Sequence, residues 1–266
     1  MDMKNLLYCW VAMISVCFAC NKQPGVPAMT MTMRIDRPYP LFWPVTILLS
    51  GTGSVTIDWG DNNSETFTLN AYKEDDWAYF DNKYKYNHAY SASSTYTIRI
   101  EGENITHMTC NSSGGELTSL NVRENNRLEY LDCWVNQLTS LDVSKNTLLK
   151  SLICQNNQLK DLDLRENIML TFLNCRSNQL TSLDLSKNTK LTELDCTSNQ
   201  LTSLDVSKNI LLYSLNCWSN QLSGLDVSKN TLLTYLDCGS NQLSGLDVSK
   251  NIALWWLGCA DNQIIN

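Results

Sequence analysis

Eight cysteines recur along the second half of the sequence, and thiols can bind metals, form disulfides or act as nucleophiles. Their spacing is 21 residues, except for 23 after the first: Cys110, Cys133, Cys154, Cys175, Cys196, Cys217, Cys238 and Cys259. Zinc needs ligands that converge on one point, and a disulfide needs a torsion that a parallel stack disfavours. Because cysteine is also a small apolar residue, we expect a core-filling column with no metal and no cofactor.

Carboxylates are the second group that could do chemistry. Glu193 and Asp195 lie two residues apart, and Asp237 lies two repeats beyond Asp195. A glycosidase uses a pair of carboxylates, so a glycan-active enzyme is one alternative function. General acid catalysis also needs a pocket that raises one pKa, and neither histidine falls near this pair. We therefore expect a protein that is not an enzyme.

The elements that must position these groups follow from a repeated frame around each cysteine. In one unit it reads Leu128-x-x-Leu131-x-Cys133-x-x-Asn136-x-Leu138. Leu131 and Cys133 are two apart, so they point to one face of a short strand, and Asn136 is placed at the bend that follows. The ten-residue return half leaves no room for a helix of three turns, which predicts extended or turn-like segments.

This frame resembles that of leucine-rich repeats of the internalin-like type. The resemblance covers residues 105–266 and implies a solenoid of about eight coils with a parallel sheet on the concave face. An inward asparagine amide would then satisfy backbone groups of neighbouring coils. Trp255, in the last unit, is expected to cover the apolar edge of the final coil.

The residues that alternate with the buried leucine and cysteine must point out of the strand face. There the repeats differ from one another, while the return half keeps its Leu-Asp-Val-Ser-Lys-Asn pattern in four units. Exposed aromatics beside carboxylates and amides are typical of binding surfaces. The candidate ligand-binding residues are Tyr130, Asp132, Trp134, Phe172, Arg176, Asp195, Trp218, Tyr235, Asp237 and Trp256.

Residues 29–104 lack the repeat and alternate strand-like runs with turns, which predicts a small β-sandwich. The phrases Val55-Thr-Ile-Asp-Trp-Gly-Asp61 and Tyr86-Asn-His-Ala-Tyr90 resemble the PKD family, which implies an immunoglobulin-like sandwich. We expect His88 to pack and hydrogen-bond there, and Asp58 and Asp61 to make turn hydrogen bonds. A calcium site at Asp58, Asp61 and Glu65 is the alternative.

Residues 1–19 read as a signal peptide, because the apolar run is too short to span a bilayer. The Phe18-Ala19-Cys20 sequence resembles a bacterial lipobox, which implies lipidation of Cys20, a tether at residues 20–28 and attachment to the outer membrane of a Gram-negative bacterium, at the cell surface. The net charge of -7 argues against nucleic-acid binding.

The overall expectation is therefore a mainly β protein: a signal peptide, a PKD-like sandwich and a leucine-rich-repeat solenoid. Its expected function is binding or adhesion at the cell envelope, with an unidentified protein or glycan as the ligand and a lipid as the only membrane anchor. A structural or self-associating envelope protein is the main alternative function.

Overall fold

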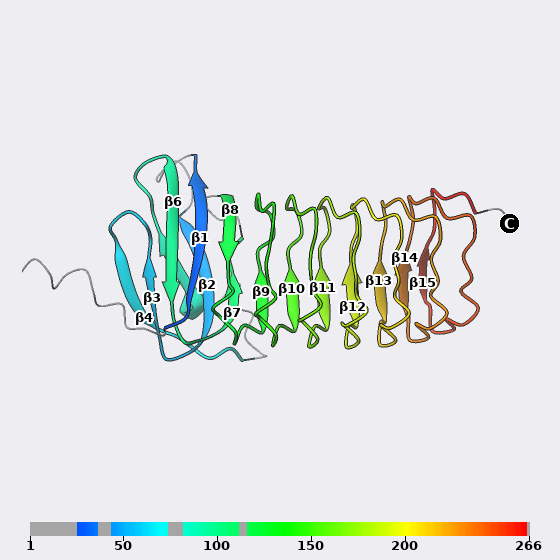
Figure 1. Cartoon of the computed structure of the whole chain (residues 1–266), viewed down its shortest axis with the longest axis horizontal. Coiled ribbons are helices and arrows are strands. Elements are labelled where there is room, and N and C mark those ends of the chain that lie inside the picture. Colours follow the sequence, from blue (N-terminus) through cyan, green and yellow to red (C-terminus); the bar gives the residue numbers. More distant parts are fainter. Residues whose placement is uncertain (1–25, 37–43, 74–81, 112–115, 265–266) are drawn as a thin grey trace, which may run out of the picture.

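The structure is a computed structural model that describes residues 26–36, 44–73, 82–111 and 116–264. The regular elements of the described chain are strands, apart from one short 3-10 helix, η1 (Asn82–Tyr84), and the chain forms a long array with a thicker N-terminal end (Figure 1). In these ranges there is no helix of the length and apolarity that a membrane span requires. The predicted signal peptide and Cys20 lie outside the described residues.

Two sheets face each other at the N-terminal end. One has the strand order β4-β3-β6-β1-β8, and the other sets β5, β2 and β7 side by side. Apolar side chains from both sheets belong to one buried cluster. The strands are β1 (Ala28–Ile35), β2 (Val45–Thr52), β3 (Ser54–Asp58), β4 (Ser64–Thr68), β5 (Lys85–His88), β6 (Ser94–Glu101), β7 (Asn104–Thr109) and β8 (Glu116–Asn121).

Strand β1 shows why this sequence forms a two-layer structure. Met29, Met31 and Met33 are at most 1% exposed, whereas Thr30 and Thr32 between them are partly exposed. Successive side chains of a strand point to opposite faces, so the Met-Thr alternation gives one apolar face. That face packs into the core while the strand pairs with β6 on one side and β8 on the other.

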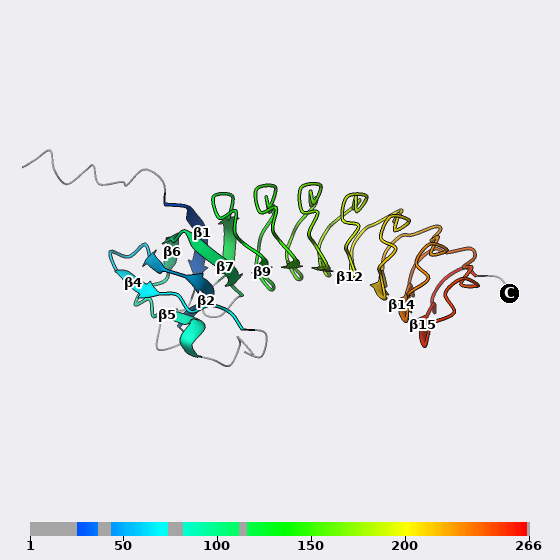
Figure 2. The same cartoon turned by 90° about the horizontal axis from the view of Figure 1, so that it is seen from below.

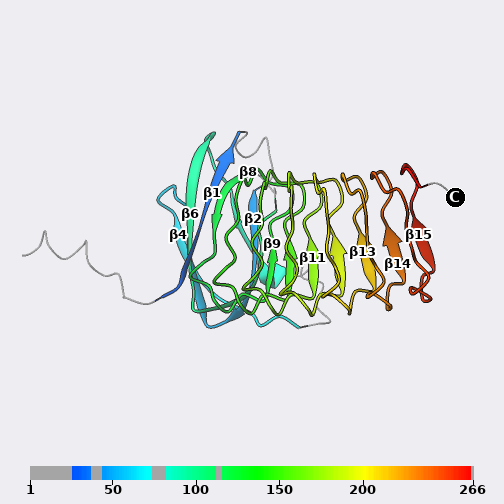
Figure 3. The ribbon, with the colours of Figure 1, turned by 45° about the vertical axis from the view of Figure 1, so that its right-hand side comes forward.

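Both sheets continue across the predicted domain boundary at residue 104. Strand β7 pairs antiparallel with β2 and parallel with β9, so one ten-stranded sheet runs from β5 to β15 (Figure 3). Strand β8 is the return segment of the first coil, and it pairs antiparallel with β1. The N-terminal strands therefore cover both walls of the first coil, which would otherwise be open edges.

The solenoid is built from three-residue strands that pair in parallel at a constant offset. They are β9 (Tyr130–Asp132), β10 (Ser151–Ile153), β11 (Phe172–Asn174), β12 (Glu193–Asp195), β13 (Ser214–Asn216), β14 (Tyr235–Asp237) and β15 (Trp256–Gly258). With β7 they make eight rungs joined by seven turns of chain. Where the return segments are described they contain no helix, as predicted, and the array bends towards the side that carries the strands (Figure 2).

The cysteine column lies inside this coil, as predicted. From Cys110 to Cys238 the seven side chains are at most 1% exposed, Cys259 is partly exposed, and all eight are free thiols. Each thiol sits in the coil with the leucines of the frame, such as Leu173 and Leu180, both fully buried. Leucine, cysteine and valine columns and the N-terminal apolar residues form one continuous core.

The asparagine at each bend binds backbone groups of its own coil and of the preceding coil, again as predicted. Asn178 Nδ2 donates to the carbonyls of Cys154 at 3.0 Å and Cys175 at 3.1 Å, while its Oδ1 accepts the Leu159 N–H at 3.0 Å. Equivalent bonds recur from Asn136 to Asn262. Each amide thus joins two successive rungs and leaves few buried groups unsatisfied.

A second asparagine column, which the frame did not predict, lies in the return half. Asn146 Nδ2 donates to the carbonyls of Val122 at 3.0 Å and Asn125 at 2.8 Å, and Asn146 is fully buried. The same bonds recur to Asn251. The signal was present in the sequence, because asparagine recurs at this return position every 21 residues.

Candidate functional site

The concave face presents the residues that flank the buried leucine of each short strand. In β11 to β14 the burial pattern is the same: the central leucine is buried, and its two neighbours are partly exposed. The parallel register places equivalent residues beside one another, so each outward position becomes a column along the solenoid axis. This geometry confirms the outward alternation for these strands.

Nine of the ten predicted ligand-binding residues are partly or fully exposed in the structure. They are Tyr130, Trp134, Phe172, Arg176, Asp195, Trp218, Tyr235, Asp237 and Trp256. The tenth, Asp132, was predicted to be exposed and is instead 1% exposed. It pairs in register with Thr109 of β7, which is also buried, so this outward position is covered on the first two rungs.

A hollow of about 280 Å³ lies on this face over strands β11 to β14. Three predicted residues, Phe172, Asp195 and Tyr235, meet there although they come from three different repeats. The other lining residues are Asn174, Glu193, Leu194, Ser214 and Asn216. All of them come from four neighbouring strands of one sheet, and the hollow has two aromatic flanks and is open to solvent.

The polar floor of the hollow is held in place by the backbone. Asp195 Oδ1 accepts the N–H of Thr197 at 3.0 Å, and Asn216 Oδ1 accepts the N–H of Trp218 at 3.2 Å. These bonds to the residue two positions later fix the side-chain torsions. Within the described chain Asp195 Oδ2 and Asn216 Nδ2 make no hydrogen bond, so a free acceptor and a free donor lie on neighbouring strands of the face.

Aromatic side chains are packed along the C-terminal part of the face. The rings of Tyr235 and Trp256 are 6.2 Å apart and 6° from parallel, and Trp256 is 49% exposed. The ring of Trp218 lies against Gly239, where an added Cβ would come within 2.9 Å of the indole Cδ1. The absence of a side chain at position 239 thus allows this tryptophan to lie across the next rung.

Trp255 does not cover the end of the core, which corrects the prediction made for it. It is 74% exposed and tilted against Tyr235 and Trp256, while Leu257 of the last rung remains 42% exposed. The residue directly precedes β15, and its ring centroid lies 6.4 Å from that of Tyr235 and 6.5 Å from that of Trp256. It belongs to the same aromatic group as Trp256.

The carboxylate pair considered for catalysis lies in the hollow. Glu193 Oε1 accepts a hydrogen bond from the Tyr213 hydroxyl, and this bond raises the pKa of the phenol. Glu193 and Asp195 are only partly buried on the open sheet face. Strong pKa separation needs a desolvated pocket, which a one-sided hollow does not provide.

The thiols have the properties of core groups and not of reactive ones. Burial raises the pKa of Cys175 and Cys196 well above 9.0, so the protonated form prevails at neutral pH. In the described part of the chain there is no group of three or more His, Cys, Asp or Glu side chains that could hold a metal ion.

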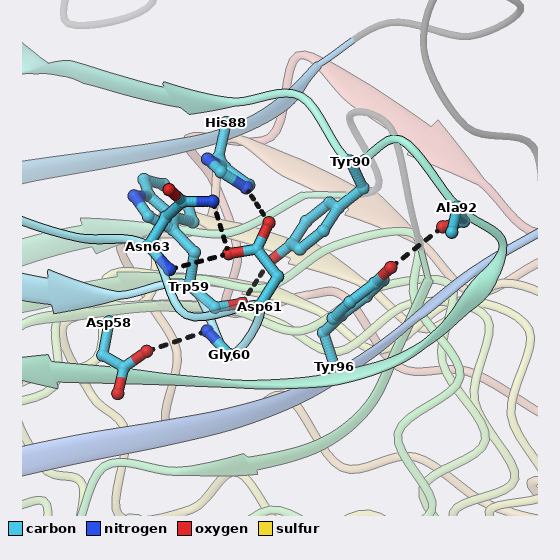
Figure 4. A network of polar contacts seen from close by, with 9 residues as sticks. All are labelled: Asp58, Trp59, Gly60, Asp61, Asn63, His88, Tyr90, Ala92 and Tyr96. Carbon is cyan, nitrogen blue, oxygen red and sulfur yellow. Dashed lines mark hydrogen bonds and ion pairs between the residues drawn. The ribbon is translucent and has the colours of Figure 1, made fainter.

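The motif residues of the N-terminal sheets form a structural network (Figure 4). His88 Nε2 lies 2.7 Å from Asp61 Oδ2, and its ring stacks on Trp59 with centroids 4.9 Å apart. Tyr90 donates its hydroxyl proton to the Trp59 carbonyl at 2.7 Å. Partial burial raises the pKa of Asp61, but hydrogen bonds from His88 and Asn63 outweigh it and the net shift is downward. Packing of His88 is therefore confirmed.

The predicted turn bonds are also present. Asp58 Oδ1 accepts the Gly60 N–H at 2.9 Å, and Asp61 Oδ1 accepts the Asn63 N–H at 3.2 Å. Gly60 has a φ of 79°, which glycine adopts without strain. Because the Asp61 carboxylate binds His88 and Asn63, it stabilises the turn.

Comparison with known proteins shows what the repeat is similar to. Residues 168–209 match the family model described as leucine-rich repeats, two copies. No curated protein matches the sequence. The functional domain of InlJ from Listeria monocytogenes, described as including a cysteine ladder, is 32% identical, over 66% of this chain and 49% of that chain, with a TM-score of 0.39.

YopM from Yersinia enterocolitica WA-314 is 28% identical, over 53% of this chain and 30% of that chain, with a TM-score of 0.45. This chain thus spans less than half of either of these two proteins. The two matched repeats share their leucine, cysteine and asparagine frame with the coils on either side. The array from β7 to β15 is a β-solenoid whose repeats are similar to leucine-rich repeats.

Proposed function

We propose that this protein is a non-enzymatic binding protein that captures a protein ligand on its concave strand face. Leucine-rich-repeat proteins generally bind protein partners. The observation that carries the proposal is the hollow, which gathers Phe172, Asp195 and Tyr235 from a face whose residues vary while the rest of the coil repeats. Half-exposed aromatics among preoriented polar groups are the usual anchors of protein interfaces.

The chemistry of the hollow indicates what part of a partner it accepts. Its volume of about 280 Å³ suits one or two side chains. Two carboxylates, Glu193 and Asp195, lie between the rings of Phe172 and Tyr235, in a chain of net charge -7. An arginine or lysine of the partner would therefore gain both charge pairing and contact with an aromatic ring.

A glycan is the second candidate ligand, because of the flat aromatic pair at the C-terminal end of the face. Tyr235 and Trp256 lie almost parallel, and Asp237, two residues after Tyr235 on the same strand, pairs in register with Asn216. Such rings can stack on the apolar face of a sugar while amide and carboxylate groups bind its hydroxyls.

Protein and glycan arrays probed with the purified protein test the proposal, followed by titration of each hit with the isolated ligand. The double variant Phe172→Ala/Tyr235→Ala removes both flanks of the hollow. We expect it to weaken protein binding at least about ten-fold, as for anchors worth over 1.4 kcal/mol. The matched control is Lys208→Ala/Lys229→Ala on the return side. Equal binding by both double variants contradicts the proposal.

The cell-envelope setting is part of the same proposal. A signal peptide at residues 1–19, a lipidated Cys20 and a PKD-like immunoglobulin-type sandwich at residues 29–104 would hold the solenoid away from the outer membrane. The support is the sequence pattern and the two facing sheets. Mass spectrometry of the N-terminal peptide tests it: we expect a diacylglycerol-modified Cys20 in the parent protein and an unprocessed leader in Cys20→Ala.

The competing role, a self-associating structural protein, predicts a different result. Light scattering over a hundred-fold range of protein concentration separates the two. We expect a constant monomer mass, because the proposed binding face is directed at a different molecule. A mass that rises with concentration, and that falls again in Phe172→Ala/Tyr235→Ala, would assign the concave face to self-association.

A further inference from the structure

A second and larger hollow, of about 500 Å³, lies where the N-terminal sheets meet the first two repeats. It lies within the volume range of ligand pockets. Its lining comes from both parts of the molecule: Gly51, Thr52, Ala71, Tyr72, Asn104, Thr106, His107, Arg127, Glu129, Leu148 and Lys150. We call it the junction pocket.

One wall of the junction pocket is aromatic. The ring of Tyr72 stacks on His107, with centroids 4.4 Å apart and planes 27° from parallel, and Tyr72 is 37% exposed. His107 in turn stacks on Tyr130 at 5.8 Å, and its Nδ1 lies 2.9 Å from the Thr106 hydroxyl. Burial lowers the pKa of His107, so the ring is neutral at pH 7. The exposed part of Tyr72 is thus a rigid, uncharged surface for stacking.

The floor is fixed by the repeat. Glu129 N–H donates to the Thr106 carbonyl at 2.7 Å, and Lys150 N–H donates to the Glu129 carbonyl at 2.8 Å, so these residues occupy one position on three successive rungs. Lys150 Nζ also binds Glu129 Oε2 at 2.6 Å. The hydroxyls of Thr52 and Thr106 and the amide of Asn104 add neutral polar groups.

Arg127 gives the pocket its charge. At the equivalent position the following repeats carry Leu148, Met169, Lys190, Leu211, Leu232 and Ala253. In the described part of the chain Arg127 has no ion pair, and it lines the pocket together with the paired Lys150 and Glu129. The local balance is one net positive charge, in a chain whose net charge is -7.

We propose that the junction pocket binds an acidic sugar unit of a glycan, with the sugar ring stacked on Tyr72 and its carboxylate bound to Arg127. A hexuronate uses all three properties of the pocket: its apolar ring face meets the aromatic wall, its hydroxyls meet the Thr and Asn groups, and its carboxylate takes the bidentate guanidinium. The open form of the pocket suits one unit of a longer chain. This site is separate from the concave hollow and does not depend on it.

Calorimetric titration with oligosaccharides of glucuronate, galacturonate and mannuronate tests the proposal. The carboxyl-reduced form of each is the matched probe, because it keeps the ring and loses the charge. We expect at least one hexuronate series to bind, and its reduced form to bind at least about ten-fold more weakly, as for loss of a charge-assisted bond. A peptide of alternating Glu and Ser is the third probe, and we expect it to bind more weakly than the hexuronate.

Two variants locate the binding. Arg127→Gln and Tyr72→Leu should each weaken hexuronate binding at least about ten-fold, whereas Lys190→Gln, which removes a charge at the equivalent position three rungs away, should not. Phe172→Ala/Tyr235→Ala should bind hexuronate like the parent, which keeps this test independent of the concave face. Unchanged thermal unfolding shows that the variants fold.

Four outcomes would each overturn the proposal: no binding of any hexuronate series, equal binding of the reduced forms, unchanged binding by Arg127→Gln, or tighter binding of the acidic peptide. A change in the chemical shifts of the His107 ring when hexuronate is added to the parent protein, absent in Tyr72→Leu, would support stacking of the sugar on Tyr72.

Discussion

Raising the pH from 7 to 10 should weaken this fold through the thiols buried in its solenoid. The seven cysteines from Cys110 to Cys238 are at most 1% exposed, and burial raises their pKa above the ordinary value of 9.0, to about 12 for Cys238. In the unfolded chain the same thiols ionise near pH 9. A group whose folded pKa is raised stabilises the fold below its unfolded pKa, and that contribution is lost as the pH rises above it.

The size of the effect follows from the number of thiols. At pH 10 an unfolded thiol with a pKa of 9.0 gains about 1.4 kcal/mol from ionisation that the folded thiol does not gain. Seven such groups sum to about 10 kcal/mol, which is comparable with the whole stability of a typical domain. Tyr86 and Tyr90, whose pKa values burial also raises, act in the same direction at higher pH.

Urea unfolding at pH 7 and pH 10, under reducing conditions, measures this loss, and one substitution assigns it. Cys175→Ala removes one thiol, so the decrease between the two pH values should be smaller than in the parent by about 1.4 kcal/mol. The free energy lost with the packing of the sulfur is the same at both pH values, so it cancels in the difference between them. Leu173→Ala, a cavity variant on the same rung, should keep the parent's pH dependence. If Cys175→Ala also keeps it, the thiol is not buried as described.

Three further predictions concern individual positions. Val135 has a φ of 55°, which a β-branched residue adopts with strain, while the equivalent positions carry Asn, Ser and Asp. Val135→Asn should therefore raise the free energy of unfolding by about 1 kcal/mol in urea titrations. No gain would contradict the backbone conformation at this position. Asn178→Ala should lower it by about 3 kcal/mol, because the Leu159 N–H and two carbonyls lose a buried partner; a loss under 1 kcal/mol would contradict the ladder. Gly239→Ala should displace the Trp218 ring, seen as a shift of its indole N–H resonance, and an unmoved resonance would show that the ring lies elsewhere.

The sequence predicted the inside of the solenoid well because each coil has the same neighbours. Leu173 and Cys175 alternate with outward residues, and a fixed offset of 21 residues places each beside its equivalent in the next coil. The bend asparagines followed from the same argument, since a buried amide must find backbone partners. A local pattern therefore determined a long-range structure, which is possible only in a repeat.

The junction with the N-terminal sheets could not be predicted in this way. The pairing of β1 with β8 joins residues more than 80 positions apart, and no local pattern specifies it. Asp132 lies on the rung next to this junction, and its burial was not predicted either. Tyr72 and His107 come from opposite sides of the sequence boundary, so their stacking and the junction pocket could not be seen from either part.

The sequence predicted residues of the candidate site but not the shape of the site. The predicted outward columns contain Phe172, Asp195 and Tyr235, but the hollow also forms because some neighbouring side chains are small. Ser214 lies between Glu193 and Tyr235 in one column, and its short side chain leaves space between them. The repeated frame determines which way each side chain points. The depth of a hollow on the surface depends on the sizes of the side chains on adjacent rungs.

Residue-resolved covalent labelling of the native protein, read by mass spectrometry, tests most directly whether the thiol column is inside and the aromatic columns are outside. Iodoacetamide and hydroxyl radicals report thiols and aromatic rings in the same sample. We predict that the thiols from Cys110 to Cys238 stay unmodified while Trp218 and Trp256 are oxidised, with Cys259 alkylated first as unfolding begins. Alkylation of the thiol column at the rate of the urea-unfolded chain, with both tryptophans protected, would contradict the account of the core and of the binding face together.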